Sequence, residues 1–220
     1  YYEKLSADPN KPLLNRGLVQ TVPPGSTFKL VTSAAALENG YQPDSVLPGP
    51  AAYQLPGSAR QLNNWSNAPC GPDGKTTLAN ALAISCNSAF AYLGNQLGDD
   101  ALRTQAEKFG FGTSFDVPMT AATSRFPEDP DDAQTAMSAI GQFDVAATTL
   151  QMAMVTASIA NGGKTMYPYL VNQVLAPDLT VLSQTQPRNF DQAMSQQNAS
   201  ELIGMMVQVV NSGTGSNARI

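Results

Sequence analysis

The segment from Thr76 to Gly98 is the strongest constraint on the fold, because it contains no charged side chain. Leu78, Leu82 and Ala89 are spaced to share one face of a helix. A membrane span needs about 20 predominantly apolar residues, and Asn and Ser side chains interrupt this stretch throughout. We therefore expect a buried helix or helix pair. The break should fall at Ser85-Cys86-Asn87-Ser88, because Ser and Asn side chains compete for backbone hydrogen bonds.

The rest of the chain is predicted to be mostly helical with two short strands. A long irregular excursion separates the first two helical regions, and excursions of that length inside compact domains tend to be functional. The expected helices are 26–39, 99–109 (capped by Asp99 or Asp100), 148–160 and 191–210, the expected strands are 169–175 and 180–183, and the irregular segments are 41–75 and 111–135.

The charge balance argues against two classes of partner. The 12 Lys and Arg residues are outnumbered by 17 Asp and Glu residues, and no stretch concentrates the basic ones. A nucleic-acid face or a patch for anionic membranes is therefore not expected. One acidic group, Glu128, Asp129, Asp131 and Asp132, lacks the Gly and final Glu of an EF-hand loop. We interpret it as a solvated loop and predict no metal site.

The chain contains no histidine, which limits the catalytic chemistry open to it. A Ser-His-Asp triad, a Cys-His pair and an H-E-x-x-H zinc site are all excluded. If the protein is an enzyme, its general base must be a lysine, a carboxylate, a tyrosine or an activated water.

Ser26-Thr27-Phe28-Lys29 is the strongest candidate for catalysis. Residues three apart on a helix share a face, so Lys29 can reach the Ser26 hydroxyl. Lysine is a plausible base for a serine nucleophile once its pKa is lowered, and burial against apolar neighbours must supply most of that shift. The alternative is a serine helix cap followed by an ordinary surface lysine, since S-x-x-K alone is a common pattern.

Ser85-x-Asn87 adds a second element, because S-x-x-K together with S-x-N is typical of penicillin-binding proteins and serine β-lactamases. With these motifs, the chain resembles the transpeptidase domain of class B penicillin-binding proteins over most of its length. The resemblance is carried by Asn15-Arg16, Pro23-Pro24-Gly25-Ser26-Thr27-Phe28-Lys29, Asn64-Trp65, the helix 76–85, Ile140-Gly141-Gln142, Thr149-Leu150-Gln151, Ala160-Asn161-Gly162-Gly163 and Gly213-Thr214-Gly215.

The resemblance implies an α/β (α+β) fold of the serine β-lactamase/transpeptidase type and assigns roles to four residues. Ser26 would be the acylated nucleophile and Lys29 its general base. Ser85 would relay a proton toward the leaving amine, and Asn87 would bind the amide of the donor peptide and orient Lys29. No metal ion or organic cofactor is implied.

The third motif of the family, K-T-G, is absent from the chain. Lys164-Thr165 is followed by Met166, where the family has a glycine that leaves room for substrate, so we do not interpret this stretch as the motif. In the family the motif follows shortly after a segment like Gly213–Gly215. We therefore expect residues 1–220 to be a transpeptidase domain incomplete at both ends, which supplies mainly the helical subdomain and lacks most of the central antiparallel sheet.

Cys70 and Cys86 are the only cysteines, and their number alone favours neither a disulfide nor two separate buried thiols. The resemblance places the domain in the bacterial envelope, where thiols meet oxidising conditions. Cys86 also lies in the middle of Ser85-x-Asn87. We therefore predict a Cys70–Cys86 disulfide that ties the excursion 41–75 to the break in the helix.

The function implied is a peptidoglycan D,D-transpeptidase. Ser26 would form an acyl-enzyme with a D-Ala-D-Ala stem peptide, or with a β-lactam antibiotic, and pass the acyl group to an amine acceptor. The site would face outward from the cytoplasmic membrane, and cell-wall synthesis or division proteins would be possible partners. The alternatives are a serine β-lactamase, although no class A glutamate motif is present and Asn87 departs from class D, and a non-catalytic β-lactam-sensing or binding domain.

Overall fold

A buried central helix, α3 (Lys29–Glu38), organises the computed structural model, which describes residues 1–117, 119 and 121–219. Eight of its ten residues are buried, and α3 packs against α4, α5, α6 and α9. Three consecutive alanines, Ala34, Ala35 and Ala36, are almost fully buried. Because alanine side chains are short, neighbouring helices can approach α3 from several sides.

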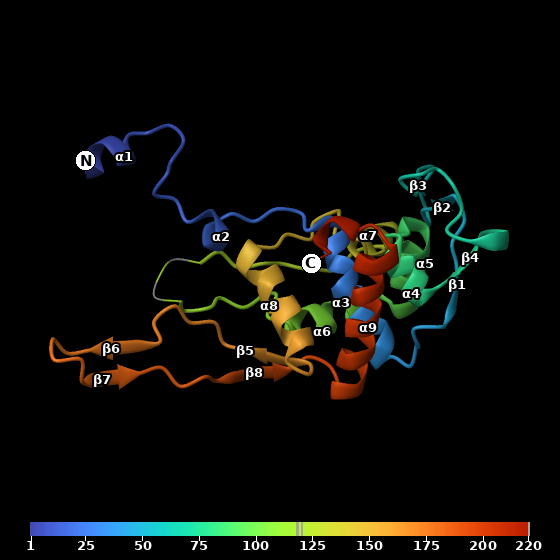
Figure 1. Cartoon of the computed structure of the whole chain (residues 1–220). Helices are drawn as coiled ribbons and strands as arrows, with labels where there is room; N and C mark the ends of the chain where they lie inside the picture. Colours follow the sequence, from blue (N-terminus) through green and yellow to red (C-terminus); the bar gives the residue numbers. More distant parts are fainter. Residues whose placement is uncertain (118, 120, 220) are drawn as a thin grey trace.

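Helices α4, α5, α6 and α9 pack around α3, whereas α1 lies away from it (Figure 1). Some helices pack against a neighbour in sequence, as α5 does against α4 and α6. Helix α7 packs instead on α5, and the last helix, α9, packs on α8 and returns to α3 and α4. The helices are α1 (Tyr2–Ser6), α2 (Arg16–Val19), α4 (Leu78–Ala83), α5 (Asn87–Leu97), α6 (Asp99–Lys108), α7 (Asp132–Ser138), α8 (Thr149–Ala160) and α9 (Gln196–Ser212), with 3-10 turns η1 (Gly25–Phe28), η2 (Pro72–Gly74) and η3 (Ser216–Ala218).

The strands form four separate antiparallel pairs in the described part of the chain, and no larger sheet is present there. The pairs are β1 (Val46–Pro48) with β4 (Lys75–Thr77), β2 (Ala52–Gln54) with β3 (Gln61–Asn63), β5 (Lys164–Met166) with β8 (Asn189–Gln192), and β6 (Gln173–Leu175) with β7 (Val181–Gln184). This small amount of sheet agrees with the prediction of a mainly helical subdomain.

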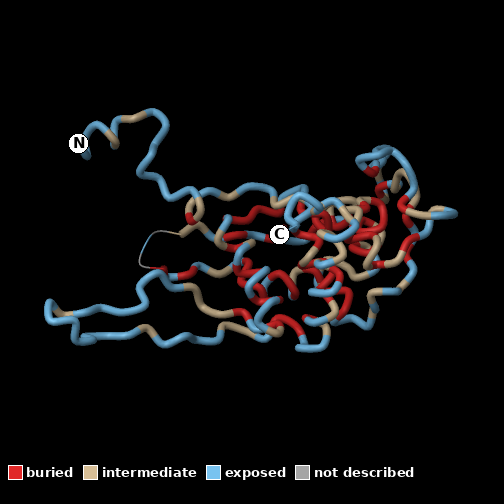
Figure 2. Tube along the Cα trace, in the orientation of Figure 1, coloured by how far each residue is buried: buried red, intermediate tan, exposed pale blue. Residues whose placement is uncertain are grey.

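Two parts of the chain project from the helical body on the same side, the segment carrying α1 and the β6–β7 hairpin (Figure 1). Figure 2 shows that both are exposed along most of their length, whereas the buried residues lie in the body. Every residue of β6 and β7 is exposed, including Val174 and Leu182. Among the described helices, none has both the length and the apolar character needed to cross a bilayer.

Most of the predicted helices are confirmed, and so is the break after α4. The segment 84–86 separates α4 from α5, as the Ser and Asn residues there suggested. The hairpin β6–β7 lies where two strands were expected. The helix 99–109 is also confirmed as α6, but Gly98 is its N-cap and Asp99 pairs instead with Arg103, at 3.0 Å.

Other predictions were wrong, because short strand pairings and the start of one short helix were missed. The irregular excursion 41–75 contains β1, β2, β3 and the start of β4. The last helix begins at Gln196 and not at Asp191, because Ser195 caps it and the residues before it pair as β8 with β5. The segment 111–135 is irregular only up to the start of α7 at Asp132.

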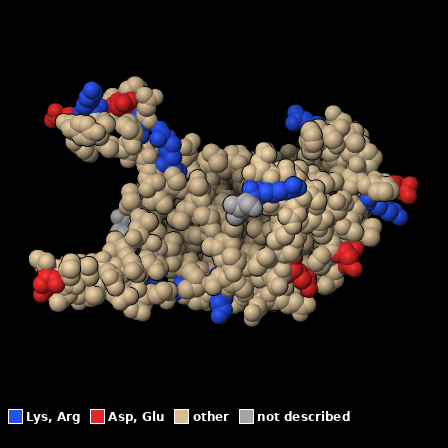
Figure 3. Space-filling model, viewed as in Figure 1, with Lys and Arg blue, Asp and Glu red and all other residues tan. Residues whose placement is uncertain are grey.

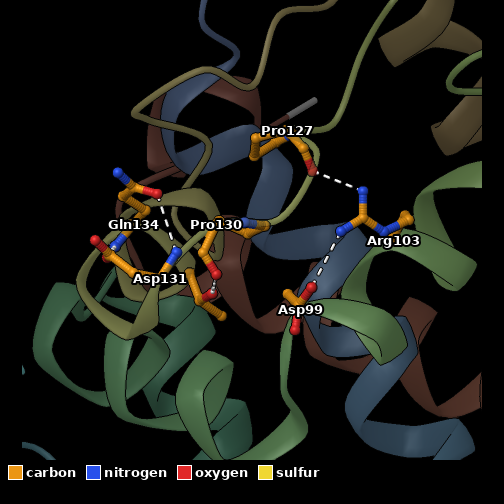
Figure 4. Close-up of polar contacts among 7 residues, drawn as sticks. Asp99, Arg103, Pro127, Pro130, Asp131 and Gln134 are labelled. Carbon is orange, nitrogen blue, oxygen red and sulfur yellow. Dashed lines mark hydrogen bonds and ion pairs between the residues drawn. The ribbon is translucent and has the colours of Figure 1, made fainter.

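The acidic group before α7 acts as a helix start, as Figure 4 shows. Asp131 accepts a hydrogen bond from the Gln134 backbone N–H at 2.8 Å, and the Gln134 side chain accepts from the Asp131 N–H at 3.0 Å. This reciprocal pair is a capping box. The same loop is fixed to α6, where Arg103 donates to the Pro127 carbonyl at 2.8 Å. All four acidic residues are exposed, as expected of a solvated loop.

We expect Asp131→Ala to destabilise the protein by about 1 kcal/mol, because the first turn of α7 then loses its side-chain cap. Glu128→Ala is the matched control, since Glu128 is exposed and makes no side-chain hydrogen bond in the described part of the chain. The free energy of unfolding from denaturant titration measures both. Equal losses for the two variants would contradict a capping role for Asp131.

Candidate active site

Ser26 lies in a tight turn that leads directly into α3. Pro24 precedes the 3-10 turn η1, and Gly25 has a positive φ of 56° that favours glycine. Phe28, in the same turn, is fully buried against the rings of Phe111 and Phe126. The turn therefore holds Ser26 at the surface, while the residues on either side of it fix the backbone.

Gly141 supports this turn from behind. Its carbonyl accepts a hydrogen bond from the Gly25 N–H at 2.9 Å. A Cβ atom at residue 141 would lie 2.3 Å from the Gly25 carbonyl oxygen and 2.7 Å from the Phe28 Cβ. Only glycine allows this close approach, so the Ile140-Gly141-Gln142 segment fixes the position of the Ser26 turn.

Lys29 is the first residue of α3, and only 1% of it is exposed. Its ammonium group donates hydrogen bonds to the Ser85 carbonyl at 2.8 Å, the Ser85 Oγ at 3.0 Å and the Asn87 Oδ1 at 2.9 Å. The Phe90 ring centroid lies 5.4 Å away. All of these contacts are with uncharged groups, and no ion pair involves Lys29 in the part of the chain that the structure describes.

Burial lowers the pKa of Lys29 to about 7, from an ordinary value of 10.5. The cause is desolvation, which disfavours the charged form of a lysine. This is the cause expected from the sequence. A substantial fraction of Lys29 is therefore neutral near pH 7 and able to accept a proton.

Ser85 connects Lys29 to Ser26. It lies in the break between α4 and α5, with a positive φ of 58°, which is unusual for serine. Its hydroxyl donates to the Ser26 Oγ at 2.9 Å and accepts from Lys29 at 3.0 Å. Among the described residues, Lys29 makes no direct hydrogen bond to Ser26, so the expected link between the two runs through Ser85.

Asn87 is the first residue of α5, and both the oxygen and the nitrogen of its side-chain amide make hydrogen bonds. Its Oδ1 accepts from Lys29 at 2.9 Å, and its Nδ2 donates to the Asn63 carbonyl at 3.1 Å. The first contact agrees with the predicted orienting role. An amide nitrogen carries two hydrogens, so one remains available for a peptide carbonyl.

A cleft of about 320 Å³ opens beside these residues. Three of the predicted site residues, Ser26, Lys29 and Ser85, line this cleft. The sequence did not predict one wall of the cleft. This wall is formed by Met206, Val209 and Val210 in the last turns of α9. These residues resemble an ordinary helix core in sequence, and the only signal was the Gly213-Thr214-Gly215 segment that follows them.

Gly213 and Thr214 bring that wall to the break after α4. The Thr214 N–H donates to the Ala83 carbonyl at 2.9 Å, and a Cβ atom at residue 213 would lie only 2.1 Å from the same oxygen. A carbonyl at the end of α4 thus receives a donor from the far end of the chain. The close contact places α9 against the site.

Cys70 and Cys86 are joined in a disulfide. Cys86 is the N-cap of α5, and Cys70 belongs to the excursion 41–75. Lys164–Met166 forms β5, where the Thr165 hydroxyl is buried and donates to the Lys108 carbonyl. Lys164 and Thr165 line no part of the cleft beside Ser26, as expected for a segment that is not the K-T-G motif.

Charged groups are sparse over the face drawn in Figure 3, and no broad basic patch appears there. Across residues 1–117, 119 and 121–219, no group of three or more Asp, Glu or Cys side chains is arranged to hold a metal ion.

Comparisons with known proteins agree with this geometry. The sequence matches the family described as "Penicillin binding protein transpeptidase domain" over residues 1–220. It is 45% identical to "Peptidoglycan D,D-transpeptidase PbpA" of Mycolicibacterium smegmatis over 207 residues, which cover 94% of this chain and 42% of the relative. The chain thus spans about two fifths of the length of the curated relatives that it matches most strongly.

Two solved structures from Mycobacterium tuberculosis share the fold. The crystal structure of PBPA has a TM-score of 0.90 and 42% identity, covering 95% of this chain and 48% of that one. A penicillin G acyl-enzyme complex of penicillin-binding protein A has a TM-score of 0.91 and 42% identity, covering 96% of this chain and 50% of that one. The α+β fold expected from the sequence is therefore confirmed.

We expect the free energy of unfolding to rise with pH more steeply in the native protein than in Lys29→Met. Between the folded pKa of about 7 and the ordinary value of 10.5, the unfolded chain binds more protons at Lys29 than the folded one. Stability therefore increases as pH rises through this window. At 1.36 kcal/mol per unit, the difference between the two proteins should grow by about 2 kcal/mol from pH 7 to 9.

Denaturant titrations at a series of pH values measure this difference. Lys29→Met removes the titrating group and keeps the side-chain volume, so changes at other groups cancel. Parallel stability curves for the two proteins would show that Lys29 titrates at its ordinary pKa.

Proposed function

Because this chain belongs to the penicillin-binding protein transpeptidase family, we propose that it carries the acylation machinery of a peptidoglycan D,D-transpeptidase. Ser26 is the nucleophile, Lys29 the general base, Ser85 the proton relay, and Asn87 the residue that orients Lys29 and binds the donor amide. The reaction is ping-pong acyl transfer from a D-Ala-D-Ala stem peptide to an amine acceptor.

One observation carries this proposal, the continuous hydrogen-bonded chain Ser26–Ser85–Lys29 that ends on a lysine with a pKa of about 7. A serine hydroxyl is a weak nucleophile unless a base removes its proton. A base is most effective when its pKa lies near the working pH. Lys29 meets this requirement, and Ser85 supplies the path between the two side chains.

When Lys29 is protonated, Lys29 donates to Ser85 and Ser85 donates to Ser26. When Lys29 loses a proton, its lone pair can accept, and both hydroxyl hydrogen bonds can reverse. Ser26 then donates to Ser85, and Ser85 donates to Lys29. As the Ser26 oxygen attacks, one proton leaves Ser26, one passes through Ser85, and Lys29 becomes an ammonium ion.

Ser26 bonds to the carbonyl carbon of the penultimate D-Ala. The bond from that carbon to the nitrogen of the terminal D-Ala then breaks, and the departing amine takes up a proton returned from Lys29 through Ser85. An amine acceptor next attacks the ester and regenerates the Ser26 hydroxyl. A β-lactam would acylate Ser26 in the same way, with its ring amide taking the place of the scissile peptide bond.

Residues 1–220 are proposed to lie within a single transpeptidase domain of a larger protein in the bacterial cell envelope. Relatives of this chain are named peptidoglycan D,D-transpeptidases, which supports an envelope location and peptidoglycan substrates. We further propose that the site lies on the extracytoplasmic face of the cytoplasmic membrane and that β-lactams inhibit the protein covalently. Cell-wall synthesis or division proteins are its proposed partners.

Fluorescent penicillin is expected to label the full-length protein covalently, and Ser26→Ala should abolish the label, because the acyl bond forms to the Ser26 Oγ. Ser33→Ala is the matched control. Ser33 lies in α3, and its buried hydroxyl makes no hydrogen bond, so its loss should leave labelling unchanged. Denaturing gels with fluorescence detection measure the label.

Equal labelling of the native protein and Ser26→Ala would refute the nucleophile. Rapid loss of label with release of hydrolysed drug would show a β-lactamase. A stable label without any release of D-Ala from a stem peptide would show a protein that only binds β-lactams.

The rate constant for acylation is expected to rise with pH, with a midpoint near 7, because only neutral Lys29 accepts the proton. Below the midpoint the rate should fall about tenfold per pH unit. Stopped-flow or quenched labelling between pH 5.5 and 8.5 measures the profile, corrected for drug hydrolysis without protein. Lys29→Arg, which stays charged, should be inactive throughout, and a flat profile for the native protein would exclude Lys29 as the base.

A further inference from the structure

Asn64 is a buried polar residue that the acylation mechanism does not use. It follows β3 within the excursion 41–75, and only 4% of it is exposed. Its Nδ2 donates to the Pro50 carbonyl and the Ala68 carbonyl, both at 2.9 Å. Its Oδ1 accepts from the Ser88 backbone N–H at 3.0 Å. Both hydrogens and the oxygen of the amide are therefore in use, as expected for a buried group with a defined role.

The contact with Ser88 caps helix α5 from outside the helix. The first N–H groups of a helix lack internal partners, and a side chain at the N-cap position usually accepts from one of them. The N-cap of α5 is Cys86, which makes no such bond and is held in the disulfide. Asn64, which lies 24 residues earlier, supplies the missing acceptor at the second residue of α5.

This cap lies beside a strained backbone. Ser85 has a φ of 58°, and a non-glycine residue keeps this unfavourable conformation only where its surroundings enforce it. Two more bonds join the start of α5 to the excursion, from the Ser88 Oγ to the Pro50 carbonyl at 2.7 Å and from the Asn87 Nδ2 to the Asn63 carbonyl at 3.1 Å. Pro50 thus accepts from both Asn64 and Ser88.

We propose that Asn64 is a positioning residue for acylation, which holds the start of α5 so that the oxygens of Ser85 and Asn87 remain around the Lys29 ammonium group. Asn64 touches neither the nucleophile nor the base in the described contacts. It acts through Ser88, one residue after Asn87 and three after Ser85. The proposal rests on the function proposed above, but the arrangement around Lys29 can be measured without any reaction.

A purely structural role, holding the excursion against α5, is the alternative to be tested. Asn95 offers the matched control, because it makes the same kind of link at the other end of the same helix. Its Nδ2 donates to the Tyr53 hydroxyl at 3.0 Å and so joins α5 to β2. Asn95→Ala removes a part-buried amide and a link to the excursion, but it leaves the start of α5 intact.

The test compares Asn64→Ala and Asn95→Ala in the full-length protein, with three readouts. These are the melting temperature, the rate constant for labelling by fluorescent penicillin, and the pKa of Lys29. The last is followed by NMR of ¹³C-methylated lysines, with Lys29 assigned by the signal lost in Lys29→Arg. We expect Asn64→Ala to slow labelling about tenfold or more, because small displacements of reacting groups reduce rates by that order.

The pKa of Lys29 should rise by about one unit in Asn64→Ala, because a loosened start of α5 admits water and relieves the desolvation that lowers it. Asn95→Ala should change neither the labelling rate nor this pKa, even if its melting temperature falls as much as that of Asn64→Ala. Native values for Asn64→Ala, or the same changes in both variants, would overturn the proposal.

Ser88→Ala carries the test if Asn64→Ala does not fold. It removes the bond from the Ser88 Oγ to Pro50 and the 3.4 Å contact of this oxygen with the Cys86 Sγ, and it keeps the backbone cap. The proposal then requires a smaller rise in the pKa of Lys29, and an unchanged pKa would overturn it. If the native protein itself is not labelled at Ser26, the proposed function fails, while the NMR comparison still decides whether Asn64 positions the groups around Lys29.

Discussion

The site depends on one constraint, the burial of the Lys29 ammonium group among uncharged oxygens. A lysine at the surface would keep its proton near pH 7, and one paired with a carboxylate would hold it more firmly. Among the described residues, the ammonium group makes its hydrogen bonds to Ser85 and Asn87 and lies over the Phe90 ring. Because these acceptors carry no charge, burial controls the pKa of Lys29. The burial that suits Lys29 to the proposed role of base also makes its charged form unfavourable in the folded protein.

The rest of the helical body can be understood from this constraint. The short side chains of α3 allow α5 to pack closely enough to bury Lys29. The break between α4 and α5 exposes a backbone carbonyl and two side-chain oxygens at the point where Lys29 ends. A continuous helix would have used that carbonyl internally. The interruption is therefore required by the site, and the excursion 41–75 holds it in place through the disulfide and Asn64.

The sequence was informative where the signals were local. Helical periodicity located α3, α4, α5, α6 and α8, and the Ser and Asn residues at 85–88 located the break. Strands of three residues, such as β1 and β4, leave almost no periodic signal, and their partners lie 27 residues or more away in the chain, so they were missed. Burial of a lysine is equally invisible, since it depends on which helices surround α3.

The candidate catalytic residues were predicted from motifs, and so were the roles of Ser85 and Asn87 beside Lys29. The direct contact expected between Lys29 and Ser26 is not found among the described residues. Spacing placed Lys29 within reach of Ser26, and the structure instead uses Ser85 as the connection. Nothing local marked the apolar end of α9 as a wall of the cleft or Asn64 as a cap for α5. Both assignments depend on contacts between segments that are distant in sequence, which a pattern within one segment does not encode.

The contact between Lys29 and Ser85 joins residues 56 positions apart, which has a consequence for the order of events during folding. Distant contacts form only after the intervening loop has closed, and this closure is entropically costly. Until then Ser26 is an ordinary alcohol, and Lys29 is an ordinary solvated ammonium ion. The Ser26 hydroxyl of a newly made chain is thus not activated while the helices assemble. The proposed reactivity of Ser26 toward acyl donors would therefore require complete folding, and measuring it would report the integrity of the whole helical body.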